Sequence, residues 1–263
     1  MTPYLAVINA RFRMLLQYRI AALAGMSTQL FWGLIRVMIF EAFYRSSVAV
    51  QPMTLPEVVN YVWLGQAMFA MLPWWIDSEI RTMVRSGTVV YELVRPLDLY
   101  TFWYFRAIAS RAAPTLLRAT PLFVCAFLFF DLQLPPSLGS AAAWLLATLG
   151  ALLLGCAISN LIHISMLWTI AGEGVIQIVQ VSIFIFSGMI VPLPLFPDWA
   201  QPFLEFLPFR GLADIPFRLY MGHIPAHEIW SMLAHQLIWA GTLILIGRFL
   251  LGRASRRLVV QGG

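Results

Sequence analysis

The sequence predicts an all-α membrane protein with six transmembrane helices, an amphipathic interface helix at the N-terminus, and a re-entrant segment between the fifth and sixth spans. Composition is the first reason. Of the 263 residues, 60% are hydrophobic and only 11% are charged, whereas soluble domains are roughly 45 to 50% apolar. The second reason is that several apolar runs are long enough to cross about 30 Å of hydrocarbon. We expect residues 1–263 to form one transmembrane domain.

Residues 1–20 have the pattern of an amphipathic helix. Apolar side chains recur at helical spacing from Tyr4 onward, while Asn9 and Arg13 lie on the opposite face. This pattern is typical of a helix at a membrane surface, and it also fits a short helix packed on protein. We expect the surface position because a long apolar run follows directly.

Apolar runs define the predicted spans. They cover residues 21–44, 57–76, 112–130, 141–166, 175–195 and 230–251. Tryptophans lie near the ends of the second run, as expected for side chains anchored at the membrane interface. In the fourth run, Gly150, Gly155 and Ser159 form a face of small residues on which another helix can pack closely.

The distribution of arginine predicts the orientation, because every one of the 17 basic residues is Arg. One group lies before the first span, between the second and third, or after the sixth: Arg11, Arg13, Arg19, Arg81, Arg85, Arg95, Arg106, Arg111, Arg248, Arg253, Arg256 and Arg257. The opposite side receives only Arg45, Arg210 and Arg218. Positively charged loops stay in the cytoplasm, so we expect both termini there. The N-terminus shows no signal-peptide cleavage pattern, which indicates an uncleaved chain.

The sequence lacks the residues that several classes of protein need for their function. Without Lys, the chain cannot contain a phosphate-binding loop of the G-x-x-x-x-G-K-[ST] type, so any ATP hydrolysis must come from another polypeptide. No lipase or metalloprotease motif occurs, and we expect no enzyme. Pro225 separates His223 from His227 and disfavours a helical metal pair. The arginines beside apolar runs suit anionic lipid rather than nucleic acid.

Two long connections stand out. The first, 77–111, has a charged helical start, a break at Ser86 and Gly87, and a short amphipathic helix over 89–94. We expect a soluble partner to dock on this cytoplasmic loop. The second, 192–228, has a proline every few residues and many aromatic side chains, which favours short helices that dip back into the membrane against protein.

Polar residues inside the predicted spans form stripes. The stripe residues include Gln29 and Arg36 in the first span, Asn160 and His163 in the fourth, and Glu173, Gln177, Gln180 and Ser187 in the fifth. Such stripes either hold helices and subunits together or line a path for a polar or amphipathic solute, and both interpretations stay open. Arg36 costs roughly 2.5 to 3.5 kcal/mol at a helix centre unless it reaches the interface or pairs with an acid, for which Glu41 is the candidate.

Several segments, taken in order, carry a family resemblance. They are Gly87, 93–98 (LVRPLD), 187–199 (SGMIVPLPLFPDW), 207–209 (LPF), 214–222 (DIPFRLYMG) and the arginine-rich C-terminal tail. With the amphipathic N-terminus and the two long connections, they make the chain similar to the membrane subunit of type 2 ABC transporters, the bacterial ABC-2 permease family. The resemblance extends over the whole chain.

The resemblance implies the transmembrane subunit of an ATP-driven exporter in the bacterial cytoplasmic (inner) membrane, with a drug, lipid, glycan or peptide-like substrate. Two copies of a cytoplasmic ATP-binding-cassette ATPase would bind ATP and Mg, so the chain itself needs no cofactor. A second permease chain, identical or paralogous, would complete the pathway among membrane lipids. The alternatives are an ATP-independent secondary carrier and a non-transporting scaffold. The absence of an inverted repeat or an intramembrane carboxylate cluster counts against the carrier.

The resemblance also implies roles for particular residues. ATPase coupling would involve Arg11, Arg13, Glu79, Arg81, Arg85, Gly87, Glu92, Arg95 and Glu173, the last in a turn over 171–174. The pathway or dimer interface would involve Gln29, Arg36, Asn160, His163, Gln177, Gln180 and Ser187. An outer gate would involve Pro192, Pro194, Phe196, Pro197 and Phe209.

Overall fold

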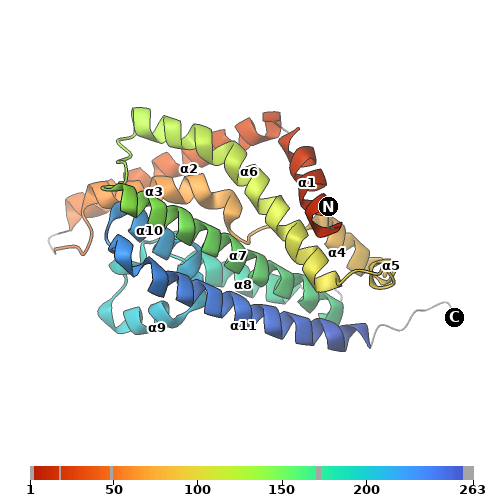
Figure 1. The fold of residues 1–263 in the computed structure, drawn as a ribbon. Coiled ribbons are helices and arrows are strands. Elements are labelled where there is room, and N and C mark those ends of the chain that lie inside the picture. Colours follow the sequence, from red (N-terminus) through yellow and green to blue (C-terminus); the bar gives the residue numbers. More distant parts are fainter. Residues whose placement is uncertain (1–2, 18, 48–49, 170–172, 257–263) are drawn as a thin grey trace.

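The computed structural model describes residues 3–17, 19–47, 50–169 and 173–256. Within these ranges the chain forms α-helices and short 3-10 helices and no strand, which confirms the predicted all-α class (Figure 1). The longest helices are α2 (Arg19–Ser46), α6 (Leu99–Phe129), α7 (Leu138–Thr169) and α11 (Ile229–Ser255). The shorter α-helices are α1 (Pro3–Leu16), α3 (Leu55–Met68), α4 (Ser78–Arg85), α5 (Val90–Leu93), α8 (Glu173–Phe186), α9 (Gln201–Phe206) and α10 (Asp214–Met221).

Three helical segments in the described ranges are long and apolar enough to cross a membrane. They are Leu99–Phe129, Leu138–Thr169 and Ala226–Ser255, and α8 is apolar but shorter. The remaining predicted spans fall on α2 and α3, of which α2 carries charged side chains and α3 is short. The count of six spans therefore stays a prediction.

The helix that contains the third predicted span begins earlier than the sequence predicted. We expected a span over 112–130 after a loop that ended at Arg111, but α6 starts at Leu99, where the Asp98 carboxylate caps it by accepting from Thr101 N at 2.9 Å. Arg106 and Arg111 lie within α6 and are only 5% and 6% exposed. Their charges do not end the helix because both find acceptors inside the protein. The connection that the sequence predicted over 77–111 is correspondingly shorter.

Helix α7 lies at the centre of the fold and packs along α11, with α6 and α10 also against it (Figure 1). Its small residues permit this approach. Gln236 of α11 reaches over them and donates Nε2 to the carbonyls of Ala147 at 2.9 Å and Gly211 at 2.7 Å. A Cβ added at Gly150 would lie 2.2 Å from Gln236 Oε1. The small-residue face predicted on the fourth span is thus a helix contact.

Helix α1 packs against α6 at the end of the molecule where α4 and α5 also lie (Figure 1). The ring of Tyr4 lies 5.7 Å from that of Phe105, and the Tyr4 hydroxyl accepts from Asp98 N at 3.1 Å. Leu5 and Met14 stay exposed on α1, at 48% and 44%. The amphipathic helix is therefore held by protein along one side and presents apolar side chains on another.

The segment between α8 and α11 consists of short helices joined by turns. The 3-10 helices are η2 (Leu193–Leu195), η3 (Asp198–Ala200), η4 (Pro208–Leu212) and η5 (Ala226–Glu228), with α9 and α10 between them. Gln201 Nε2 stabilises the first turn by donating to the carbonyls of Leu193 and Phe196, both at 2.9 Å. Short helices are what the prolines predicted. Their re-entry into the membrane stays a prediction.

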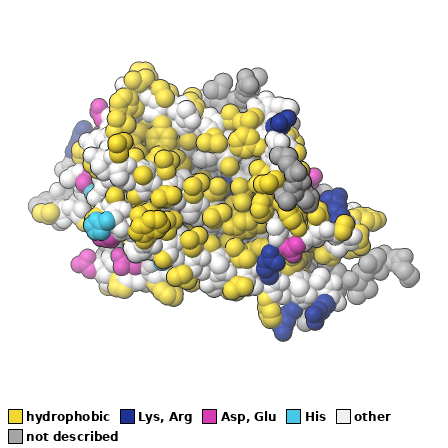
Figure 2. Space-filling model, in the orientation of Figure 1, with side chains coloured by type: hydrophobic (Ala, Val, Ile, Leu, Met, Phe, Trp, Pro, Cys, Tyr) yellow, Lys and Arg dark blue, Asp and Glu magenta, His cyan; other side chains and the backbone are white. Residues whose placement is uncertain are grey.

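The surface distribution of side chains fits a membrane protein. Figure 2 shows hydrophobic side chains across the middle of the visible face, with charged side chains toward its two ends. Large apolar side chains are strongly exposed on several helices, among them Met38 at 66%, Phe129 at 73% and Leu245 at 70%. Exposed apolar area of this kind is expected where lipid replaces water.

Candidate functional site

Helix α4 begins at a side-chain cap. Asp77 stands directly before it in extended conformation, and its Oδ1 accepts from the backbone of Glu79 at 3.0 Å and of Ile80 at 3.4 Å. Asp is among the residues preferred at this position because its carboxylate satisfies otherwise free backbone N–H groups. Ile80 is 1% exposed and anchors the inner side of α4 in the core.

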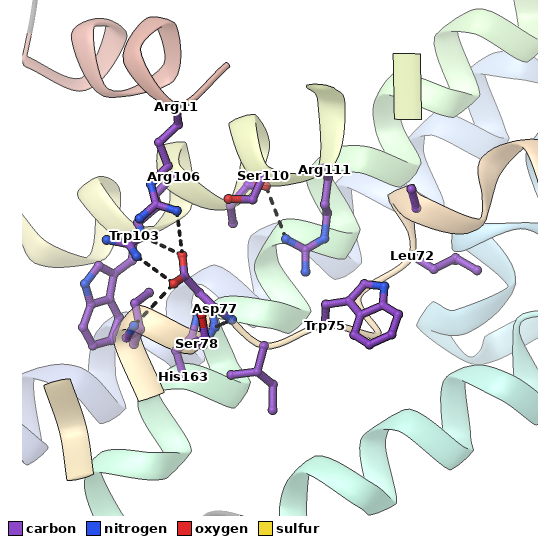
Figure 3. Close-up of a pocket in the computed structure, with 14 residues that line it drawn as sticks. Arg11, Leu72, Trp75, Asp77, Ser78, Trp103, Arg106, Ser110, Arg111 and His163 are labelled. Carbon is purple, nitrogen blue, oxygen red and sulfur yellow. Dashed lines mark hydrogen bonds and ion pairs between the residues drawn. The ribbon is translucent and has the colours of Figure 1, made fainter. Parts of the chain in front are cut away.

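The same carboxylate is the acceptor for two arginines from other helices. Arg106 of α6 donates Nε to Asp77 Oδ2 at 2.6 Å and Nη2 to Oδ1 at 2.7 Å, a bidentate pair. Arg11 of α1 approaches Oδ2 with Nη1 at 3.3 Å. Both arginines also contact the carboxylate of Glu79. We call Arg11, Asp77, Glu79 and Arg106 the charge cluster; Figure 3 shows Arg11 and Arg106 directed toward Asp77.

Helix α7 joins the charge cluster through His163. The backbone N–H of Asp77 donates to His163 Nε2 at 3.2 Å, and the imidazole packs edge-on against Trp103 with 6.1 Å between ring centroids. Because Nε2 accepts, a neutral His163 carries its proton on Nδ1. One residue, Asp77, therefore links α1, α4, α6 and α7.

The charge cluster keeps Asp77 ionised. Burial opposes its ionisation, but the hydrogen bonds and charge of Arg106, together with the charge of Arg11, lower the pKa of Asp77 from 3.8 to about 2. The carboxylate therefore stays charged throughout the physiological pH range. Protonation of Asp77 therefore does not break its arginine contacts near neutral pH.

A cavity of about 210 Å³ adjoins the charge cluster (Figure 3). Arg111 of α6 lines it, and its guanidinium donates to Ser159 Oγ of α7 and, at 3.3 Å, to the carbonyl of Ala107. Within the described ranges no three His, Cys, Asp or Glu side chains form a group suited to a metal ion. The charged and polar side chains around this cavity therefore form ion pairs and hydrogen bonds where α1, α4, α6 and α7 meet.

Other residues predicted for ATPase coupling lie nearby and pair with one another. Arg81 and Arg85 of α4 both donate Nη2 to Glu173 Oε1, at 2.8 Å and 2.7 Å, which joins α4 to the start of α8. Residues 171 and 172 of the predicted contact turn over 171–174 lie outside the described ranges. All three side chains are at least 37% exposed. This surface remains accessible to a partner.

The rest of the predicted coupling residues occupy the turn after α4 and the face of α1. Glu92 is buried and accepts from Trp103 Nε1 at 2.8 Å, while Arg95 lies 3.4 Å from the same carboxylate. Gly87 has a φ of +73°, the left-handed conformation that favours glycine. Arg13 donates to Asn9 in its own helix at 2.9 Å and lies apart from the charge cluster.

Sequence reasoning placed Arg11 and Glu79 in the coupling set but missed Asp77 and Arg106 as their partners. An acidic residue directly before an amphipathic helix is a capping signal, so Asp77 was detectable from local sequence. The contact with Arg106 was not, because it joins side chains 29 residues apart across two helices. His163 was expected to act within the pathway or dimer interface, and in this chain it bonds to the α4 cap.

Most of the stripe residues bond within the chain. Asn160 Nδ2 of α7 donates to the carbonyl of Tyr100 at 3.1 Å, and Gln180 of α8 donates to the carbonyl of Trp74. Ser187 is fully buried, and its hydroxyl accepts from Met189 N at 3.2 Å. Gln177 is exposed on α8. The bonds of Asn160 and Gln180 join separate segments of the chain, which fits one of the two roles predicted for the stripes, that of holding helices together.

Arg36 does not pair with Glu41, the acid that the sequence offered as one of two ways to accommodate its charge. Glu41 lies 3.6 Å from Arg45, whereas Arg36 Nη2 donates to the carbonyls of Met189 and, at 2.6 Å, Ile190 in the segment after α8. Residues four apart share a helix face, but residues five apart do not, so Glu41 faces Arg45.

The predicted gate residues belong to the short-helix segment. Pro192 is buried, Pro194 and Phe196 are half-buried, and Pro197 is exposed. The half-buried ring of Phe209 in η4 lies 6.2 Å from that of Phe186 at the end of α8. The five residues thus belong to a compact aromatic segment between α8 and α10, and their gating role stays a prediction.

Comparison with known proteins gives the family. A family model described as ABC-2 family transporter protein matches residues 30–262. The comparison with curated proteins returned no match. The family is a membrane component of transporters that typically lacks an ATPase site of its own, and the apolar helices fit a multi-pass membrane protein. The matched region covers most of the chain, which therefore belongs to the ABC-2 family of transporter membrane proteins.

Proposed function

We propose that the chain is the permease subunit of an ATP-driven exporter in the bacterial inner membrane. Two copies of a separate cytoplasmic ATPase drive it, and a second permease chain completes the pathway. The family membership supports the transport role. The absence of Lys supports an ATPase on another polypeptide, because a phosphate-binding loop needs that residue. Both termini and the α4–α5 region then lie on the cytoplasmic side, as the arginine distribution predicts.

The observation that carries the proposal is the four-helix link at Asp77. A loop that only connects two spans needs no such fixing, but α4 is held through Asp77 to α1, α6 and α7. A push on α4 or α1 from the cytoplasm therefore moves α6 and α7, which are apolar enough to cross the membrane. Contacts of this kind can carry movement of an ATPase into the membrane helices.

The outer side of this junction suits a protein partner. Around α5, Tyr91 and Val94 are 71% and 76% exposed, although both are apolar or aromatic. Arg85 at the end of α4 and Arg95 shortly after α5 flank this short helix in the sequence, and both side chains are about half-exposed. Exposed aromatic side chains near arginines are typical of docking surfaces, and the arginines favour an acidic patch on the ATPase.

The test is purification of the tagged chain from native membranes in mild detergent, followed by identification of bound proteins and an ATP hydrolysis assay. We expect an ATP-binding subunit in stoichiometric amount, with vanadate-sensitive hydrolysis. Replacing Tyr91 by Asp should release that subunit, whereas replacing the fully exposed Val50 by Asp, in the connection between α2 and α3, should not. A chain that purifies alone and without hydrolysis would favour the carrier or scaffold instead.

A further inference from the structure

A second and larger cavity, of about 600 Å³, lies between α2, the end of α3 and the segment after α8. It follows α2 from Thr28 to Ile39, about 16 Å at the helical rise of 1.5 Å per residue. Its walls are mainly apolar and include Trp32, Phe69 and Phe184. A cavity of this volume accommodates a drug-sized molecule. We call it the Arg36 groove.

Arg36 brings an uncompensated positive charge to this groove. Its Nη2 donates to two backbone carbonyls, and its Nη1 donates to Gln66 Oε1 at 3.3 Å in the amide orientation that satisfies both ends of Gln66. All of these acceptors are neutral. In the described ranges no ion pair includes Arg36. A positive charge among apolar walls is costly unless an anion accompanies it.

Gln29 is the second polar feature of the groove. It lines the same cavity and is 5% exposed, and among the described residues neither its Nε2 nor its Oε1 has a hydrogen-bond partner. Buried amides are nearly always bonded, so a side chain left free at a cavity wall points to a ligand. Gln29 precedes Arg36 by seven residues, which places it on the same face of α2 about 10 Å away.

We propose that the Arg36 groove binds an amphipathic anion. The acidic head, a carboxylate or a phosphate, lies at Arg36, and the apolar body lies against Trp32, Phe69 and Phe184. A second hydrogen-bonding group about 10 Å from the head meets Gln29. This inference rests on the proposed function and names its substrate class: the exporter moves amphipathic anions, and cations are disfavoured by the charge of Arg36.

The first test measures binding to the complete complex in phosphatidylcholine nanodiscs. The probe is 11-(dansylamino)undecanoic acid, which has a carboxylate, an apolar chain and a sulfonamide. Its neutral methyl amide and the corresponding primary amine are the matched probes. We expect saturable binding of the acid and at least about tenfold weaker binding of the other two, because a charge-assisted contact is lost. Equal binding of all three probes overturns the proposal.

Substitutions locate the site. Arg36→Gln should weaken binding of the acid about tenfold and abolish the preference for it over the methyl amide, while Arg36→Lys should retain that preference. Gln29→Met should weaken the sulfonamide probe more than plain dodecanoate, which has no second polar group. Arg45→Gln is the control, because Arg45 lies on the same helix but outside the groove. Unchanged binding in both Arg36→Gln and Gln29→Met overturns the proposal.

Two further arms remove ambiguity. If the Arg36→Gln complex fails to assemble, two other results test the proposal. They are the preference of the unaltered complex for the acid over the methyl amide and the amine, and the effect of Gln29→Met on binding of the sulfonamide probe. Adding phosphatidylglycerol to the nanodiscs identifies the source: competition with the probe indicates a membrane lipid, and no competition indicates a free solute. If the complex hydrolyses ATP but binds the acid, the methyl amide and the amine equally well, the proposed ligand of the Arg36 groove is wrong and the proposed function stands. Charge-selective binding by a chain that never associates with an ATPase refutes the proposed function alone.

Discussion

Arg106 holds both carboxylate oxygens of Asp77, the residue that caps α4, at 2.6 Å and 2.7 Å. One of these oxygens, Oδ1, accepts both from Arg106 and from the first backbone N–H groups of α4. Any rotation of the Asp77 side chain away from Arg106 therefore also weakens the start of α4. The position of α4 is thus tied to α6 by geometry rather than by chain connectivity.

Replacing Asp77 by Asn should destabilise the protein by about 2 kcal/mol, because Arg106 is buried and loses its bidentate acceptor. Asn still caps a helix, so the loss reports mainly the arginine contacts. Thermal unfolding in detergent measures it, and coupled ATP hydrolysis in the complex should fall as well. Asp198→Asn, at an exposed position in η3, is the control and should change neither quantity. A native transition temperature in Asp77→Asn would contradict the assigned role.

The stability of the protein should decrease at low pH because Asp77 becomes protonated. Its pKa falls from 3.8 to about 2 on folding, so its contribution is complete above about pH 4 and disappears as the pH falls toward 2. The shift corresponds to about 2 kcal/mol. The difference in unfolding temperature between the unaltered chain and Asp77→Asn should therefore shrink between pH 6 and pH 3. A constant difference over that interval would show that Asp77 is not the titrating group.

The contact of Arg85 with Glu173 should position α4 against α8. Both side chains are about half-exposed, so we expect only about 0.2 to 1 kcal/mol of stability from the pair. Arg85→Glu should nevertheless lower coupled ATP hydrolysis, because it places two carboxylates together. The double variant Arg85→Glu with Glu173→Arg should restore most of it. Failure of the exchanged pair to restore activity would mean that Arg85 acts on the ATPase and not on Glu173.

Gly87 should tolerate small polar residues better than branched ones. A Cβ would meet nothing within 4 Å there, so backbone conformation alone opposes substitution at a φ of +73°. Gly87→Val should strain the turn between α4 and α5 by roughly 1 to 2 kcal/mol and reduce coupled hydrolysis, while membrane insertion stays normal. Gly87→Asn should retain most activity, since Asn adopts the left-handed conformation more readily. Equal loss in both variants would indicate a steric contact with the partner.

Gly150 should be intolerant of even one added carbon. Gly150→Ala pushes against Gln236, whose amide is fixed by two carbonyls, and should cost roughly 1 to 3 kcal/mol in unfolding free energy. Gly241→Ala in α11 is the matched control, because an added Cβ meets nothing within 4 Å there. The helix preference for Ala over Gly should make the control neutral or stabilising. Similar unfolding temperatures for the two variants would contradict the α7–α11 contact.

The sequence predicted those features that depend on local pattern. Helical spacing in 1–20 gave the amphipathic helix observed as α1, and the break at Gly87 followed by 89–94 gave α5 almost to the residue. These elements follow from side chains within a few positions of each other, which is the range over which helix spacing and turn preference act. The small-residue face around Gly150 was predictable for the same reason.

Features that depend on distant partners were not predictable. The start of α6 was placed too late because Arg106 and Arg111 looked like loop residues, and only the fold shows their acceptors on α4 and α7. Arg36 likewise bonds to backbone 153 residues away, while the nearby Glu41 faces Arg45. The position of a buried charged side chain can be predicted only when its hydrogen-bond acceptor is known.

The packing of α1 has a consequence for biogenesis. This helix leaves the ribosome before α4 and α6, but its fixed contacts are with residues made much later: Tyr4 meets Phe105, and Arg11 meets Asp77. Chains fold from the N-terminus during synthesis, so α1 must wait unattached until α6 has been inserted. Docking of α1 therefore depends on α6 having formed and reached its place, so the position of the first helix reports on the folding of a helix that follows it by more than 80 residues.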